Sequence, residues 1–138
     1  MLISNGPGDP AELDVTAIRA LMGKVPMFGI GLGHQLMAIA AGASTVKMPY
    51  GHRGGNQPVK ETASGRTYIT VQNHGYAVVS ETVKNGTVSF VNANDGTCEG
   101  IDYPEMNAFS VQFYPTAGGP RSTAFLFERF ITMMGGEN

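Results

Sequence analysis

A glycine-rich stretch, FGIGLGHQ at residues 28–35, joins an apolar run to a segment with a helical pattern. Gly29 and Gly33 flank its centre with the spacing of a nucleophile elbow, a sharp strand-to-helix turn that lifts one side chain above an α/β sheet. A serine or cysteine at the centre would support nucleophilic acyl transfer. The central residue is Gly31, so the sequence predicts the turn of an active site without its nucleophile.

Other residues that could do chemistry are explained more simply by structure. Cys98 follows a predicted hairpin turn in an apolar segment, which is typical of a small core residue. His34, His52 and His74 have no cysteine or acidic neighbour at the spacing of zinc or calcium ligands. Residues 5–8 lack the lysine and hydroxyl residue of a phosphate-binding loop. No metal and no cofactor are therefore expected.

The elements that must position the turn follow from hydrophobic periodicity and turn residues. A buried strand is expected at residues 25–30, and a helix at residues 34–41. An earlier helix begins near Pro10, with Asp9 as its cap, and the last helix begins after Ser122. Residues 48–58, rich in Gly and Pro, predict a loop. Further strands are expected at residues 67–72, 77–79, 87–91, 97–101 and 108–113, with a hairpin turn at residues 94–96. This mixture predicts an α/β domain.

Composition limits the class of protein and its partners. The 138 residues suffice for a single domain, taken here as residues 1–138. A net charge of −2 gives no basic surface for nucleic acid or an anionic membrane. No apolar run approaches the ~20 residues of a transmembrane helix. One cysteine cannot form an internal disulfide, so a reducing compartment, the cytoplasm, is expected.

Four segments together resemble the class I glutamine amidotransferases, and most closely the glutaminase domain of carbamoyl-phosphate synthetase small subunits. They are ISNGPGDP at residues 3–10, FGIGLGHQ at 28–35, GHRGGNQPVK at 51–60 and QNHGYAV at 72–78. The match is specific because all four occur in this order across nearly the whole chain. The resemblance implies a flavodoxin-like mixed sheet with flanking helices, here lacking the family's first strands.

The resemblance also implies a reaction, and the chain departs from it at the reacting groups. In the family, a cysteine thiolate attacks the side-chain amide of glutamine, and a histidine oriented by a glutamate transfers the protons. The corresponding catalytic positions here are Gly31, Tyr114 and Thr116. A phenol with an ordinary pKa near ~10 is a poor base at neutral pH, and threonine carries no charge. With all three positions substituted, a catalytically inactive domain is expected.

The substrate pocket can outlast the chemistry, because several of its groups are backbone groups. By resemblance, the oxyanion hole would use the N–H groups of Leu32 and Gly8. The positions that match the family's glutamine site are Gly6, Gly8, Leu32, Gln35, Asn73, Gly75 and Tyr76. The same residues can also be turn formers and helix-packing residues, so both interpretations remain open.

Relative to the family, the chain begins in the middle of the sheet. That would leave an apolar edge, which a second copy of the chain would cover most simply. Three functions remain open. The first is a binding or assembly module that retains a glutamine-type pocket. The second is a small-subunit-like component of a carbamoyl-phosphate synthetase that uses ammonia through a large synthetase subunit. The third is a structural homo-oligomer.

Overall fold

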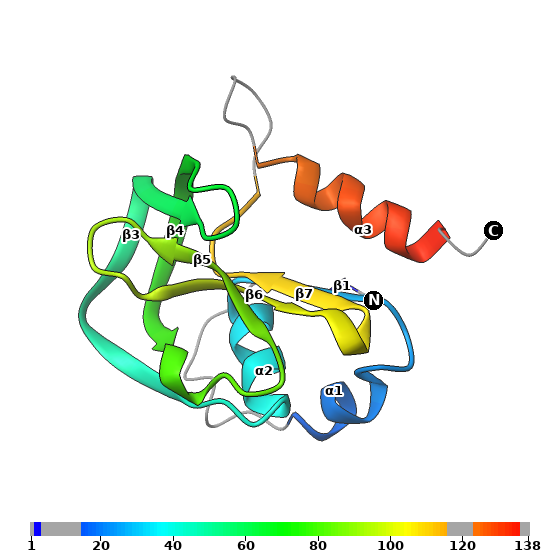
Figure 1. Cartoon of the computed structure of the whole chain (residues 1–138). Coiled ribbons are helices and arrows are strands. Elements are labelled where there is room, and N and C mark those ends of the chain that lie inside the picture. The colour runs from blue at the N-terminus through cyan, green and yellow to red at the C-terminus, as the bar shows by residue number, and fades with distance from the viewer. Residues whose placement is uncertain (1, 4–14, 116–122, 136–138) are drawn as a thin grey trace.

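A computed structural model describes residues 2–3, 15–115 and 123–135, and in it one mixed sheet lies between helices on both faces (Figure 1). The strands are β1 (Leu2–Ile3), β2 (Met27–Ile30), β3 (Thr45–Glu61), β4 (Thr67–Val78), β5 (Thr87–Asn92), β6 (Cys98–Tyr103) and β7 (Ala108–Val111). The helices are α1 (Thr16–Leu21), α2 (Leu32–Ala40) and α3 (Phe125–Gly135), with short 3₁₀ turns at Ser80–Thr82 and Pro104–Met106. Helices α1 and α2 lie on one face and α3 on the other.

The sheet has a parallel end and an antiparallel end. Its strand order is β1-β2-β7-β6-β5-β3-β4. Strand β2 pairs in parallel with β1 and with β7, and the remaining pairs are antiparallel. Because parallel strands all end at the same edge, residues that follow β2 and β7 emerge next to one another. The predicted α/β class with a mixed sheet and flanking helices is confirmed.

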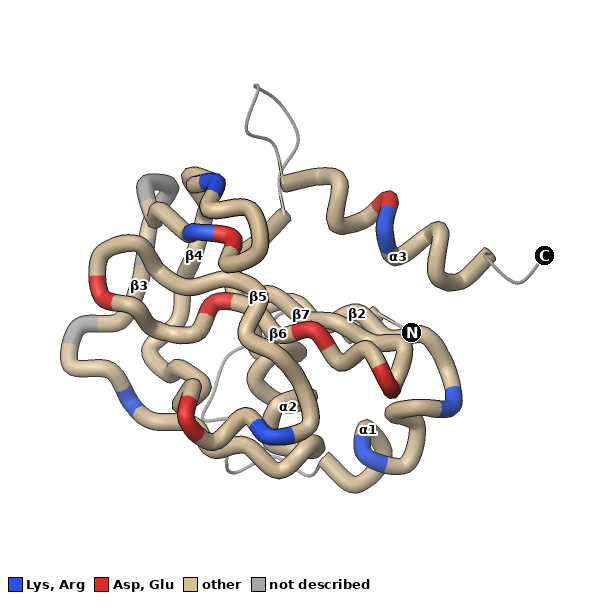
Figure 2. The backbone as a smooth tube through the Cα atoms, viewed as in Figure 1, with Lys and Arg blue, Asp and Glu red and all other residues tan. Residues whose placement is uncertain are grey.

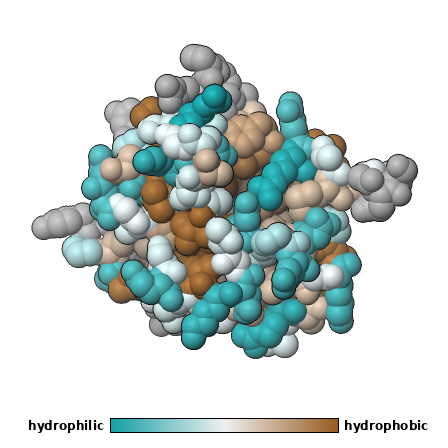
Figure 3. Space-filling view, in the orientation of Figure 1, coloured by the Kyte–Doolittle hydropathy of each residue, from teal (hydrophilic) through white to brown (hydrophobic). Residues whose placement is uncertain are grey.

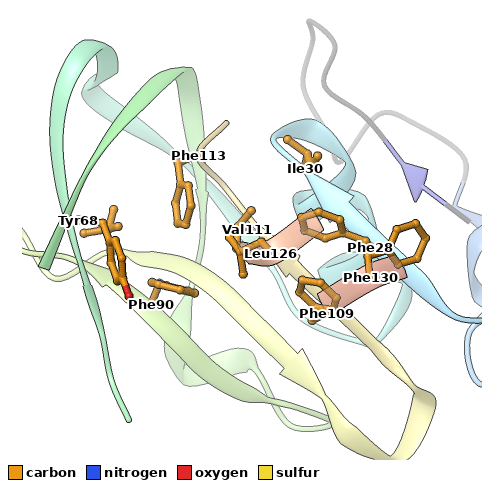
Figure 4. Close-up of a cluster of buried hydrophobic side chains, with 10 residues drawn as sticks. Phe28, Ile30, Tyr68, Phe90, Phe109, Val111, Phe113, Leu126 and Phe130 are labelled. Carbon is orange, nitrogen blue, oxygen red and sulfur yellow. The ribbon is translucent and has the colours of Figure 1, made fainter. Parts of the chain in front are cut away.

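Strand β2 is buried on both faces, which explains why its sequence is an apolar run rather than an alternating pattern. Met27 belongs to a core that includes Met37 of α2, while the next residue, Phe28, belongs to a core that includes Phe130 of α3. Figure 4 shows Phe28 and Phe130 beside Phe109, whose ring stacks on that of Phe28 at 4.3 Å between centroids. The two helical layers are therefore anchored on opposite sides of one strand.

The predicted loop at residues 48–58 was wrong, because these residues lie within β3. The pairing of β3 with β4 continues through two shifts of register, one between Lys47 and His52 and one between Gly54 and Gln57. Gly51 and Gly54 adopt φ of 70° and 103°, which only glycine accepts readily. Glycines that signal a loop in the sequence thus form irregularities within a long strand. The two strands expected at residues 67–72 and 77–79 are also one strand, β4.

Other predicted elements are close to those observed. The hairpin turn at residues 94–96 joins the antiparallel strands β5 and β6, and Gly96 there has φ of 75°. The strand and helix around the glycine-rich turn are β2 and α2, each displaced by two residues or fewer. The predicted capping residues Asp9, Pro10 and Ser122 lie outside the described residues.

The described surface is mixed in character. Figure 2 shows acidic and basic residues interspersed along the chain rather than gathered by sign. Figure 3 shows hydrophobic side chains near the centre of the visible face, bordered by hydrophilic ones. Within the described residues, none of the helices has the length and apolar character needed to cross a membrane.

Candidate functional site

The glycine-rich turn has the strand-turn-helix geometry predicted for it. Gly31 follows β2 and caps α2 with φ of 61° and ψ of −117°, outside the regions that side-chain-bearing residues favour. Its N–H donates to the Val111 carbonyl at 3.0 Å, and its own carbonyl accepts from the Gln35 N–H at 3.3 Å. Glycine therefore relieves a conformation that would strain any nucleophile at this position.

The flanking glycines are needed because the strand and helix approach closely. A Cβ added at Gly29 would lie 2.5 Å from the Met37 sulfur and 2.9 Å from the backbone of Gly33. A Cβ added at Gly33 would collide with the backbone carbonyl of Ile3 in β1. Both positions exclude larger residues through packing, whereas the glycine at position 31 is required by backbone conformation.

A small pocket opens directly above this turn. It has a volume of about 90 Å³ and is lined by Ile30, Gly31, Val71, Gln72, Asn73, Gln112 and Tyr114. Since one water needs roughly 10–15 Å³ measured in this way, the pocket can hold a group of several heavy atoms. Its polar side chains are amides and a phenol, and none of the lining side chains is charged. Such a lining suits a neutral ligand that both donates and accepts hydrogen bonds.

Two of the predicted catalytic positions meet in this pocket. Gly31 and Tyr114 both line it, and Tyr114 has 53% of its surface exposed. The Tyr114 N–H donates to the Val71 carbonyl at 3.0 Å, which ties the segment after β7 to β4. The third position, Thr116, lies outside the described residues. The described wall thus has a phenol at the position predicted for the base, and no side chain at the position predicted for the nucleophile.

Of the predicted binding residues that the structure describes, one lines the pocket and the others lie on the adjoining segments of α2 and β4. Asn73 lines it directly, and Leu32 is the first residue of α2, immediately after the turn. Gln35 is buried and donates to the Tyr76 carbonyl at 2.8 Å and to Gln112 Oε1 at 2.7 Å. Gly75 is partly buried in β4, between Asn73 and Tyr76. Gly6 and Gly8 lie outside the described residues.

Burial makes the two other candidate reactive groups inert. Cys98 is in the core, and burial raises the pKa of its thiol to about 12, so no thiolate forms at neutral pH. His34 is fully buried next to the turn, with Nδ1 2.7 Å from Ser110 Oγ. Burial, together with the nearby His74, lowers the pKa of His34 to about 3, so the ring stays neutral. Both residues are structural.

Sequence reasoning missed a group of polar residues behind the pocket wall, most of them buried, with His74 half-buried and Asp95 exposed. This inner polar cluster lies on or next to strands β3, β4, β5 and β6, and its members are His52, Gln72, His74, Asn92, Asp95 and Glu99. Gln72 belongs both to the cluster and to the pocket. One signal was available in the sequence, because Glu99 is an acidic residue between Cys98 and Gly100 in a predicted strand. Burial raises the pKa of Glu99 to about 7, although hydrogen bonds from Asn92 and Gln72 oppose this.

Comparison with known proteins assigns the class. The chain belongs to the class-I glutamine amidotransferase family, whose model matches residues 1–133. Among solved structures, the fold is similar to a candidate GMP synthase subunit from Thermoplasma acidophilum (TM-score 0.79, 18% identity, 99% of this chain and 72% of the other). It is also similar to a glutamine amidotransferase from Thermotoga maritima (TM-score 0.70, 21% identity, 99% and 63%).

Within that family, the chain is similar to carbamoyl phosphate synthase small chains. It is 50% identical to the protein of that name from Staphylococcus epidermidis strain RP62A, over 97% of this chain and 38% of the relative. It is 49% identical to that from Syntrophotalea carbinolica, over 97% and 37%. The chain therefore spans well under half the length of these relatives. The predicted resemblance is confirmed.

Proposed function

We propose that this chain is a glutamine amidotransferase-type domain that binds a carboxamide, such as the side chain of glutamine, without hydrolysing it. The observation that carries the proposal is the meeting of Gly31 and Tyr114 in one amide-lined pocket. A carboxamide has one acceptor and two donors, which the amides of Asn73 and Gln112 can complement. Binding of this kind needs no covalent bond.

The proposed loss of hydrolysis follows from the reacting groups. Acyl transfer needs a nucleophile within reach of the amide carbon, and Gly31 has no side chain to supply one. At the position predicted for the base, Tyr114 presents an exposed phenol, which lacks the basic ring nitrogen of an imidazole. Cys98 cannot substitute, because its thiol is buried in the core and stays protonated.

Calorimetry and an ammonia assay on the purified chain test both halves of this proposal. We expect saturable heat on titration with glutamine and no ammonia release above the buffer rate. Gly75→Leu should abolish the heat by filling the predicted pocket, whereas Ala63→Leu, in the exposed turn after β3, should leave it unchanged. Glutamine turnover by the wild type would contradict inactivity, and a lack of binding would reduce the domain to a scaffold.

A second function is favoured by the similarity to carbamoyl phosphate synthase small chains at 49–50% identity. Under this alternative the domain supports a synthetase partner that takes free ammonia. Co-expression with a large synthetase subunit, followed by affinity capture, would show a stable complex if this is correct. The native mass of the chain alone tests the third alternative, a homo-oligomer, which requires a dimer or larger species. In each case we propose that the chain acts in the cytoplasm.

A further inference from the structure

The inner polar cluster brings three possible metal ligands together from three strands. His52 of β3, His74 of β4 and Glu99 of β6 each offer one ligand atom, and these atoms lie within 4.8 Å of one another. His52 and His74 are directly opposite in the pairing of β3 with β4, and their rings are 5.0 Å apart, edge to face. The pairing of the strands thus brings these three side chains together inside the fold.

His52 presents a lone pair to the interior of the cluster. Its Nε2 lies 2.7 Å from Asp95 Oδ2. Asp95 Oδ1 also accepts from the Thr97 N–H at 3.0 Å and from the Thr97 hydroxyl at 2.7 Å. A carboxylate oxygen accepts hydrogen bonds, so in this contact the hydrogen is on His52 Nε2, and the lone pair of a neutral ring is on Nδ1. That atom is buried, has no hydrogen-bond partner and lies 3.6 Å from Glu99 Oε2.

Glu99 adds further acceptor atoms to the same place. Its Oε2 accepts from the amides of Gln72 and Asn92 at 2.9 Å and 3.0 Å, while the buried Oε1 has no partner. The side chain is fully buried, and among the ion pairs of the described residues its partner is His52 rather than a lysine or arginine. A buried carboxylate is costly without a compensating positive charge.

His74 contributes a second imidazole to the cluster. Its Nδ1 donates to the Tyr76 carbonyl at 2.8 Å, and its Nε2 lies 2.6 Å from Gln72 Oε1. The amide nitrogen of Gln72 donates to Thr70 and Glu99, so the same glutamine contacts both His74 and Glu99. His52, His74 and Glu99 therefore lie in one connected group of polar side chains.

We propose that His52, His74 and Glu99 bind a divalent transition-metal ion, and that zinc is the ion they suit best. Two imidazoles and a carboxylate form a ligand set that zinc accepts. Ligand atoms of a tetrahedral zinc site are about 3.4 Å apart, given bonds of 2.0–2.1 Å. The His52–Glu99 pair at 3.6 Å nearly meets that spacing, and the distances to the ligand atom of His74, which do not exceed 4.8 Å, must close to it on binding.

Asp95 supports this assignment from outside the ligand set. A metal-binding histidine commonly donates its other N–H to a carboxylate, which fixes the tautomer and raises the basicity of the ligand. The contact between His52 and Asp95 has this arrangement. Bound metal would link β3, β4 and β6 behind Gln72 and Asn73, and so hold the pocket wall in place. This inference does not depend on what the pocket binds.

Zinc titration of the chelator-treated, full-length chain tests the proposal. Calorimetry should give one zinc ion per chain, and zinc should raise the melting temperature, whereas magnesium should do neither. We expect Glu99→Gln and His52→Asn each to weaken zinc binding by at least about tenfold, and Asp95→Asn by about tenfold to a hundredfold. Cobalt in place of zinc should show the visible absorption of a four-coordinate ion.

Two matched controls separate the cluster from general effects of substitution. His34→Asn removes the remaining histidine, and Glu105→Gln removes an exposed carboxylate, so both should bind zinc like the wild type. Circular dichroism verifies folding, and if Glu99→Gln is unfolded, His52→Asn and Asp95→Asn decide. The absence of saturable zinc binding by the wild type would overturn the proposal. Zinc binding as tight as that of the wild type in folded Glu99→Gln, His52→Asn or Asp95→Asn would overturn it equally.

Discussion

At the scale of single residues, Gly31 shows how the turn has been separated from its reaction. Gly31 retains the backbone conformation of the turn, with φ of 61° and ψ of −117°. It has no nucleophilic side chain, which is the group whose chemistry would require this strained conformation. A residue with a Cβ in such a region costs about 1–3 kcal/mol. The fold therefore gains stability at the position where a nucleophile would sit.

This argument predicts that Gly31→Ala lowers the free energy of unfolding by about 1–3 kcal/mol. Urea denaturation followed by circular dichroism measures the change. Gly96→Ala is a suitable comparison, because Gly96 also has positive φ, at 75°, but its added Cβ meets nothing within 4 Å. We expect the smaller loss at Gly96. An unchanged or higher stability for Gly31→Ala would show that the turn is not strained.

A second residue-scale prediction concerns Gln35, whose hydrogen bonds connect α2 to the residues around the pocket. Gln35→Met keeps the length of the side chain but removes the donors to the Tyr76 carbonyl and Gln112 Oε1. Leaving buried acceptors unpaired should destabilise the fold by about 1–3 kcal/mol. The double variant Gln35→Met with Gln112→Met should cost less than the sum of the single variants, because both partners are then apolar. Strict additivity would contradict a direct coupling.

At the scale of elements, the contact of α2 with β1 depends on the absence of a Cβ at Gly33. Helix propensity alone predicts that Gly33→Ala stabilises α2 by about 1 kcal/mol. Because the added Cβ would collide with the Ile3 carbonyl, we expect the opposite sign, a loss of about 1–3 kcal/mol. Gly135→Ala, at the exposed end of α3, should be neutral or slightly stabilising. Thermal denaturation of the two variants provides the comparison, and a stabilised Gly33→Ala would refute the packing argument.

The arrangement of strands and helices also explains which parts of the site could be predicted from the sequence. The turn at Gly31 was predictable because its signal is local, a strand, three spaced glycines and a helix. The meeting of Gly31 with Tyr114 follows from topology, because Ile30 of β2 pairs with Val111 of β7 and both strands then leave the sheet at one edge. A family resemblance was needed to expect it, since periodicity does not specify which strands are neighbours.

The inner polar cluster could not be predicted in the same way. Its residues come from separate strands, and their convergence depends on the register of β3 against β4. That register shifts between Lys47 and His52, and a slip of one residue would turn His52 to the other face of the sheet. The glycines that permit the shift indicated a loop rather than a strand. The cluster is therefore a product of tertiary pairing, which no local pattern in residues 48–58 specifies.

At the scale of the whole molecule, two buried groups act on stability in opposite directions as pH changes. Between about pH 4.5 and 7 the folded chain keeps a proton on Glu99 that the unfolded chain releases, so the free energy of unfolding falls as pH rises. Between about pH 3 and 6.5 the folded chain leaves His34 neutral while the unfolded chain binds a proton there, so stability falls as pH drops. The two effects overlap and partly cancel near pH 5–6.

Single variants should separate these two contributions when urea denaturation is repeated from pH 4 to 8 in the presence of a chelator. Glu99→Gln removes the titrating group, so the stability of the wild type minus that of the variant should decline by up to about 3 kcal/mol from pH 4.5 to 7. For His34→Asn the same difference should instead rise with pH up to about 6.5. Glu105→Gln, at an exposed carboxylate, should give a flat difference. Parallel profiles for wild type and Glu99→Gln would mean that Glu99 is ionised in the fold at every pH tested.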